Sequence, residues 1–156
     1  MKRFPRARTL PLLAFALLAC ASGARAQARR ADFRGSWNYA VYAKDKSELP
    51  PAFRDMGIEE VPAYAIDITI KQRGSRLTAT CGVVARYLAR IDDCGFDATA
   101  RNGAAQFTLK SNFGGTATVR LTLRGDSLSW KVVRRRGVSY FPEDVVLRRL
   151  KPGELP

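Results

Sequence analysis

Apolar and polar residues alternate along most of the chain between residues 33 and 150, and this alternation constrains the fold more than any other feature of the sequence. Successive side chains of a β-strand point to opposite faces, so a period of two predicts strands with one buried and one solvated face. Clear examples are residues 66–70, residues 77–83 and the run around Trp130. About seven to nine such strands fit, so the chain is expected to be all-β.

Short turn sequences separate these runs and set the order of the strands. They are Arg73-Gly74-Ser75, Asn102-Gly103 and Arg124-Gly125-Asp126, and such residues tolerate a positive φ angle between antiparallel neighbours. No helical pattern is long enough to cover the sheet. The sequence therefore predicts a single antiparallel meander closed into a small barrel of about eight strands. Charges near strand centres, at Lys71, Arg120 and Lys131, favour a water-soluble barrel over a membrane-spanning one.

The first 26 residues have the plan of a signal peptide. A basic start is followed by about ten apolar residues and by small residues that end in Ala24-Arg25-Ala26. The apolar run is too short to span a bilayer. Cleavage before Gln27 is expected, which leaves residues 27–156 as one barrel domain in the bacterial periplasm. The alternative is a lipobox-like sequence ending at Cys20, which would make the protein an outer-membrane lipoprotein.

The mature chain is basic and lacks histidine. Residues 27–156 hold 22 Lys and Arg against 14 Asp and Glu, a net charge of +8. Histidine is the commonest general base and metal ligand, and no serine lies in a nucleophile-elbow pattern. The chain is therefore predicted not to be an enzyme and to need no metal or cofactor. The positive charge favours an anionic partner, and export argues against nucleic acid.

Two cysteines remain after the signal segment, Cys81 and Cys94. An even pair in an oxidising compartment predicts a disulfide, because a separation of thirteen fits neither a Cys-x-x-Cys redox motif nor a metal knuckle. The bond would close a loop of about 14 residues and stabilise the fold by roughly 3 kcal/mol.

Residues 44–62 form the longest stretch without alternation. Pro51 can begin a short helix there. The apolar Phe53 and Met56 either plug one end of the barrel or belong to a lid over a ligand mouth.

The chain resembles the lipocalin-like, or calycin, barrels. Gly35-Ser36-Trp37 opens the first strand as Gly-x-Trp does in that superfamily, a long loop and a meander follow, and Arg148-Arg149 end the last strand where the family often carries an arginine. The resemblance implies that Trp37 is buried at a closed barrel end with the stem of Arg148 or Arg149 against its ring. Gly35, Trp37, Trp130, Arg148 and Arg149 are thus expected to be structural.

Three clusters are candidate binding residues. Arg134, Arg135 and Arg136, together with Arg148, Arg149 and Lys151, either form a basic patch for phosphates or carboxylates or are solvated strand ends. Phe113, beside Gly114 and Gly115, is either an exposed contact residue or part of a turn. Asp92, Asp93 and Asp97 suggest a cation site, but neighbouring strand residues face opposite ways, which favours a solvated turn.

Two functions follow from these features. The first is a non-enzymatic binding protein that holds a small apolar or amphipathic ligand, or an anionic envelope component. Small inward residues such as Ala79, Ala105 and Ala117 favour this function, because they leave volume in the barrel. The second is a protein-interaction module, such as an inhibitor of an envelope lysozyme or protease.

Overall fold

The computed structural model describes residues 31–154, so the predicted signal segment, its cleavage site and Cys20 lie outside the described residues. Three short 3-10 helices and eight strands follow one another. They are β1 (Gly35–Val41), η1 (Lys46–Glu48), η2 (Pro51–Phe53), η3 (Ile58–Glu60), β2 (Tyr64–Arg73), β3 (Arg76–Ala85), β4 (Arg90–Thr99), β5 (Ala104–Lys110), β6 (Thr116–Arg124), β7 (Ser127–Arg136) and β8 (Asp144–Arg149). The all-β prediction is confirmed, and no helix within residues 31–154 is long and apolar enough to cross a bilayer.

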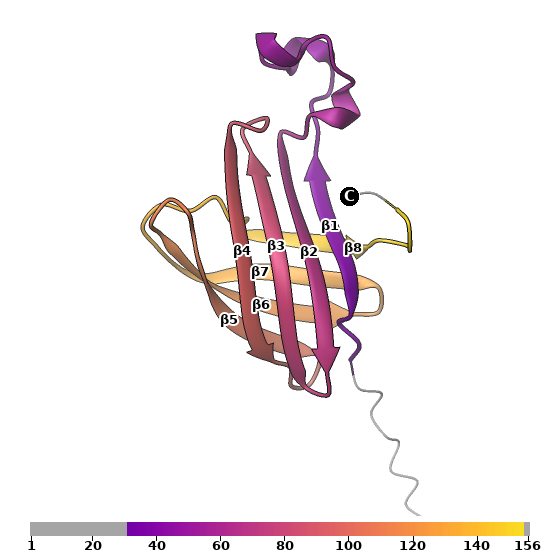
Figure 1. Ribbon diagram of the computed structural model, residues 1–156, viewed down its shortest axis with the longest axis vertical. Helices are drawn as coiled ribbons and strands as arrows, with labels where there is room; N and C mark the ends of the chain where they lie inside the picture. The colour runs from indigo at the N-terminus through magenta and orange to yellow at the C-terminus, as the bar shows by residue number, and fades with distance from the viewer. Residues whose placement is uncertain (1–30, 155–156) are drawn as a thin grey trace, which may run out of the picture.

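One antiparallel sheet contains all eight strands, in the order β4-β3-β2-β1-β8-β7-β6-β5. Figure 1 shows β1 to β4 crossing in front of β5 to β8 at a steep angle, so that the sheet folds over on itself. The first and last strands join the two halves, with Trp37 opposite Arg149 and Asn38 opposite Arg148. The expected turns also occur, and Asn102 and Gly103 adopt φ angles of 50° and 74° between β4 and β5.

The sheet does not close completely into a barrel. The gap, which we call the seam, lies between β4 and β5. These strands are the two edges of the sheet. Within residues 31–154, one backbone bridge, between Arg101 and Ala104, links them at the hairpin. The pairing does not continue beyond it, because β5 turns away from the direction of β4. Side chains close the seam instead: the rings of Phe96 and Phe107 stack with centroids 3.6 Å apart.

Large apolar side chains fill the interior. Trp37 and Trp130 are fully buried, and each indole N–H donates to a backbone carbonyl at 3.0 Å, that of Phe33 and that of Pro142. A buried indole needs such a partner, so both rings are held in place. The inward alanines lie in the same core cluster as these rings, and Ala117 is fully buried.

Trp37 closes one end of the barrel, which we call the closed end. The guanidinium carbon of Arg149 lies 4.2 Å from the centre of the Trp37 ring. The same side chain donates to the carbonyls of Asp32, at 2.8 Å, and of Arg34. Gly35, with φ at +115°, permits this approach, since a Cβ there would lie 3.2 Å from Nη1 of Arg149. The predicted burial of Trp37 against a terminal arginine is confirmed.

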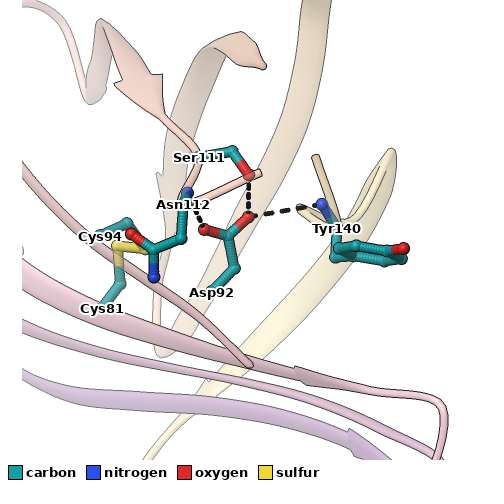
Figure 2. Close-up of a disulfide and its surroundings, with 6 residues drawn as sticks. All are labelled: Cys81, Asp92, Cys94, Ser111, Asn112 and Tyr140. Carbon is teal, nitrogen blue, oxygen red and sulfur yellow. Dashed lines mark hydrogen bonds between the residues drawn. A yellow bond between two sulfur atoms is a disulfide. The ribbon is translucent and has the colours of Figure 1, made fainter. Parts of the chain in front are cut away.

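The disulfide is also confirmed. Cys81 of β3 and Cys94 of β4 are directly opposite in the sheet and are bonded, with their Cα atoms 4.8 Å apart. The bond ties the edge strand β4 to its neighbour and lies close to Asp92 (Figure 2).

Residues 42–63 neither plug the barrel nor cover its mouth. Figure 1 shows them projecting beyond the upper ends of β1 and β2. Phe53 and Met56 pack on a separate small cluster around Leu49 and Val61, together with Tyr87 and Leu88 of the β3–β4 turn. The expected plug or lid is therefore wrong, because the segment and this turn bury their apolar side chains against each other. Pro51 does begin a short 3-10 helix, as predicted.

Candidate anion-binding face

The outer face of β5, β6 and β7 carries six exposed cations. We call this surface the basic face, and its charged residues are Lys110, Arg120, Arg124, Lys131, Arg134 and Arg136. All lie on these strands, whose inward residues, such as Leu109, Leu121 and Trp130, are buried. The polar residues between the cations are mostly Thr and Ser, including Thr108 and Thr118, whose hydroxyl oxygens lie 3.1 Å apart.

The strand register arranges the cations in rows. Lys110 and Arg136 both lie opposite Thr116, one from each side, and Arg134 lies opposite Thr118 in the next row. Neighbouring strands are about 4.8 Å apart, and alternate residues along a strand are about 6.7 Å apart. Neighbouring cations of the basic face are therefore several ångströms apart, on adjacent or alternate strand positions.

A β-bulge decides which arginines belong to the basic face. The register of β6 against β7 shifts between Thr118 and Val119, so that Val133 is the extra residue of β7. Bulges re-aim the side chains that follow them. After this bulge Arg134 and Arg136 point outward, whereas Arg135 lies opposite Ala117, which is fully buried.

Arg135 is not available for a ligand, which corrects its expected role. Its guanidinium donates to the carboxylate of Glu143 at 2.9 Å and to the carbonyls of Ser139 and Phe141 at 2.8 and 2.7 Å. It also bonds the hydroxyl of Ser139. Arg135 thus organises the β7–β8 loop, because its donors satisfy carbonyls that no strand partner can reach.

Few acids balance the basic face. Among residues 31–154, Lys131 is its one member with an ion pair, to Asp144 at 3.4 Å. Arg120 lies directly opposite Lys131 in the sheet, and like charges at that position destabilise a pair of strands. Folding alone does not account for this concentration of charge.

The other half of the sheet has mixed charges. Its outer face carries Asp67, Asp93 and Asp97 together with Lys71, Arg73 and Arg76. Asp97 accepts a hydrogen bond from Thr78 at 2.7 Å and lies 4.0 Å from Arg76. The positive charge of the domain is therefore concentrated on one side of the molecule.

Of the two alternatives for Arg148 and Arg149, a shared basic patch is wrong, because they do not lie beside Arg134. Because β8 is antiparallel to β7, Arg148 lies opposite Ser127 at the start of β7, nine residues before Arg136 and about 25 to 30 Å from it along the strand. Arg148 pairs with Glu154. Arg149 is committed to Trp37, so neither arginine is available beside Arg134.

Asp92 is buried at the end of the barrel opposite the closed end, which we call the loop end. Its carboxylate is fully buried and accepts hydrogen bonds from the Ser111 hydroxyl at 2.5 Å and the Asn112 N–H at 2.8 Å (Figure 2). A longer contact, 3.5 Å, reaches the Tyr140 N–H. A buried carboxylate needs such donors, and this one fastens the β5–β6 turn and the β7–β8 loop to β4.

Phe113 lies in a turn, as one of the two expectations held, and its ring is partly exposed. It belongs to the turn between β5 and β6, and its N–H donates to the Ser111 hydroxyl at 3.1 Å. Its ring is 38% exposed, and the remainder packs edge-on against Tyr140, with ring centres 4.8 Å apart.

No group of three or more metal-ligating side chains occurs within residues 31–154. Asp92 faces inward and is buried, whereas Asp93 and Asp97 are exposed on the opposite face, as the strand alternation predicted. The expected solvated turn is wrong, because all three aspartates lie on strand β4 and Asp92 is fully buried. Burial raises the pKa of the Tyr64 hydroxyl, which donates to the Tyr140 carbonyl at 2.9 Å.

A shallow groove of about 410 Å³ lies outside the barrel, between residues 150–154 and strands β1 and β2. Asp67 lies in its lining and accepts a hydrogen bond from the Asn38 amide at 2.7 Å. Burial raises the pKa of Asp67, and the bond from Asn38 opposes that effect.

Comparisons with protein-family models, with curated proteins and with solved structures find no match to this chain. Sequence reasoning did not include Lys110 and Arg120 among the candidate binding residues. The signal was present, because residues 98–142 hold eight Lys and Arg but a single acid, Asp126.

Proposed function

We propose that this chain is an exported, non-enzymatic binding protein of the bacterial envelope that holds an anionic partner on its basic face. The observation that carries the proposal is the set of exposed cations on β5 to β7, of which Lys110, Arg120, Arg124, Arg134 and Arg136 have no ion pair within residues 31–154. Unpaired cations on one face attract phosphates, sulfates or carboxylates.

The juxtaposition of Arg120 and Lys131 strengthens this argument. A like-charge pair that weakens the fold is expected where a ligand neutralises it. Replacing Arg120 by glutamine should therefore leave the free energy of unfolding unchanged or raise it slightly, while binding of an anion becomes weaker. A residue with a purely structural role would change stability in the opposite direction.

A soluble polyanion without acyl chains, dextran sulfate, tests the proposal. The variant K110Q/R120Q/R134Q/R136Q should bind it roughly 10- to 100-fold more weakly than the wild type, and salt should weaken the wild-type complex. The matched control is K71Q/R73Q/R76Q/R101Q, which removes the same charge from other exposed positions and should bind nearly as the wild type does. Equal losses in both variants, or no dependence on salt, would refute a localised site.

The packing at the closed end supports a relationship to the lipocalin-like barrels. Gly35, Trp37 and Arg149 form one contact there, as the resemblance implies. A ligand inside the barrel, as in many such proteins, is less favoured than one outside it, because aromatic rings occupy the core.

Protein interaction is the second candidate, and the projecting segment of residues 42–63 favours it. The segment holds five acids and three Lys or Arg, so it differs in charge from the basic face. It could enter the cleft of a basic hydrolase. Titrating a lysozyme and a trypsin-like protease with the protein tests this candidate, and full activity at a molar excess of the protein would argue against it.

A further inference from the structure

We propose that the loop end of β5 to β8 docks on an anionic lipid bilayer, with Phe113 and Val138 between the headgroups. This inference rests on the proposed function and names the partner, since Lys110, Arg134 and Arg136 would contact the lipid phosphates. We call residues 111–115 and 137–140 the tip.

The two loops of the tip form one surface. Gly115 packs on the backbone of Val138 so closely that a Cβ at Gly115 would lie 2.2 Å from the Val138 carbonyl oxygen. The rings of Phe113 and Tyr140 are also in contact. Phe113 and Val138 are 38% and 58% exposed, so adjoining loops expose two apolar side chains.

Apolar exposure is concentrated at this end of the molecule. Among residues 31–154, seven large apolar side chains are exposed: Val41, Tyr42, Ile91, Phe113, Val133, Val138 and Val146. Five of them, all except Val133 and Val146, lie in loops or in the terminal residues of strands at the loop end. Isolated exposed apolar residues are common, but an apolar group beside cations is typical of an interaction surface.

The cations lie at the depth that a bilayer surface requires. Lys110 directly precedes the first loop of the tip and Arg136 the second, and Arg134 is one row, about 7 Å, behind them. Interfacial segments insert their apolar side chains about 5 to 10 Å into the headgroup and acyl boundary. Apolar residues at the front with cations behind them match this layering better than they match a flat acidic protein surface.

Asp92 makes the tip rigid before it binds. Its carboxylate holds Ser111 and Asn112 of one loop and faces the Tyr140 N–H of the other (Figure 2). Strand β4, which carries Asp92, is in turn cross-linked to β3 by the disulfide. A preorganised surface loses little conformational entropy on binding.

Sedimentation with vesicles tests the inference. The full exported chain should bind vesicles that contain roughly one quarter phosphatidylglycerol in phosphatidylcholine, and bind pure phosphatidylcholine weakly. R134Q/R136Q should lower the partition coefficient roughly 25-fold, at about fivefold per cation. F113S/V138S should lower it about five- to tenfold. The matched controls are K71Q/R73Q for charge and V146S for apolar exposure, and both should bind nearly as the wild type does.

The outcomes separate this inference from the proposed function. If F113S/V138S binds vesicles as the wild type does while the charge variants lose dextran sulfate, insertion is wrong and the anion-binding function stands. If the protein binds dextran sulfate but no vesicles, the partner is an acidic macromolecule and the inference fails. Loss of vesicle binding in F113S/V138S with dextran sulfate binding retained supports the inference and also excludes misfolding as the cause.

A second measurement keeps an apolar side chain at the tested position. Brominated lipids should quench the fluorescence that F113W adds to the two buried tryptophans, and should leave that of V146W unchanged. Equal quenching of both variants, or of neither, would overturn insertion at the tip.

Discussion

Replacing Arg149 by alanine should lower the free energy of unfolding by about 2 to 4 kcal/mol. One guanidinium makes two kinds of contact at the closed end. Its position over the Trp37 ring contributes about 0.5 to 2 kcal/mol. Its two hydrogen bonds to the carbonyls of Asp32 and Arg34 contribute about 1 kcal/mol each, since the Arg149 side chain is 28% exposed. The pair with the exposed Asp126 adds little.

Urea unfolding of the oxidised protein, followed by tryptophan fluorescence, measures this loss. Arg149→Lys should cost about half as much, because an ammonium keeps the charge but cannot reach both carbonyls over the ring. Arg148→Ala is the matched control: its residue is adjacent and exposed, and its pair with Glu154 lies at the surface. It should change stability by less than about 0.5 kcal/mol.

The reasoning would be refuted if Arg149→Ala cost less than about 1 kcal/mol, or no more than Arg148→Ala. Trp37→Ala provides an upper reference, with an expected loss of about 3 to 5 kcal/mol for a deleted buried aromatic. If that variant were nearly as stable as the wild type, the closed end would contribute nothing to the fold.

Three further predictions concern other parts of the chain. The unfolded, unreduced protein should show no free thiol, and replacing Cys81 and Cys94 by serine should cost roughly 3 kcal/mol; two titratable thiols would contradict the bond. Asp67→Asn should stabilise the protein at pH 7. Burial raises the pKa of the Asp67 carboxyl in the folded state, so the protonated carboxyl stabilises the fold and this contribution is lost as pH rises through that pKa. Asparagine stays neutral at pH 7 and avoids that loss. The gain should vanish below about pH 4, and urea unfolding of both proteins across pH measures it. Intact-mass measurement should place the mature N-terminus at Gln27, and a diacyl or triacyl mass on Cys20 would instead identify a lipoprotein.

Much of the architecture could be predicted because it depends on local pattern. The period of two identifies strands whatever their neighbours, and turn residues such as Asn102 and Gly103 set antiparallel pairing over a few residues. The disulfide was predictable since Cys81 and Cys94 lie on consecutive strands. The seam between β4 and β5 was not predictable in this way, because it depends on the angle at which the two halves of the sheet cross.

The candidate site was predicted only in part, for a related reason. The sequence groups Arg134, Arg135 and Arg136 with the arginines at the end of the chain only if the barrel brings these strand ends together. Antiparallel β7 and β8 place Arg136 and Arg148 at opposite ends of the barrel. Residues far apart in the chain, such as Lys110 and Arg136, instead lie in one row, on either side of Thr116 of β6.

By itself, the sequence determined the strands, the turns and the disulfide, since each follows from residue type and spacing along a short stretch. The burial of Trp37 was implied by the resemblance to the lipocalin-like barrels. The tertiary structure alone decided which charges lie on the outer face of the sheet. Without the bulge at Val133, the alternation of Trp130 and Val132 would turn Arg134 and Arg136 inward and Arg135 outward. The bulge reverses that phase, because one extra residue in a strand moves every later side chain to the other face.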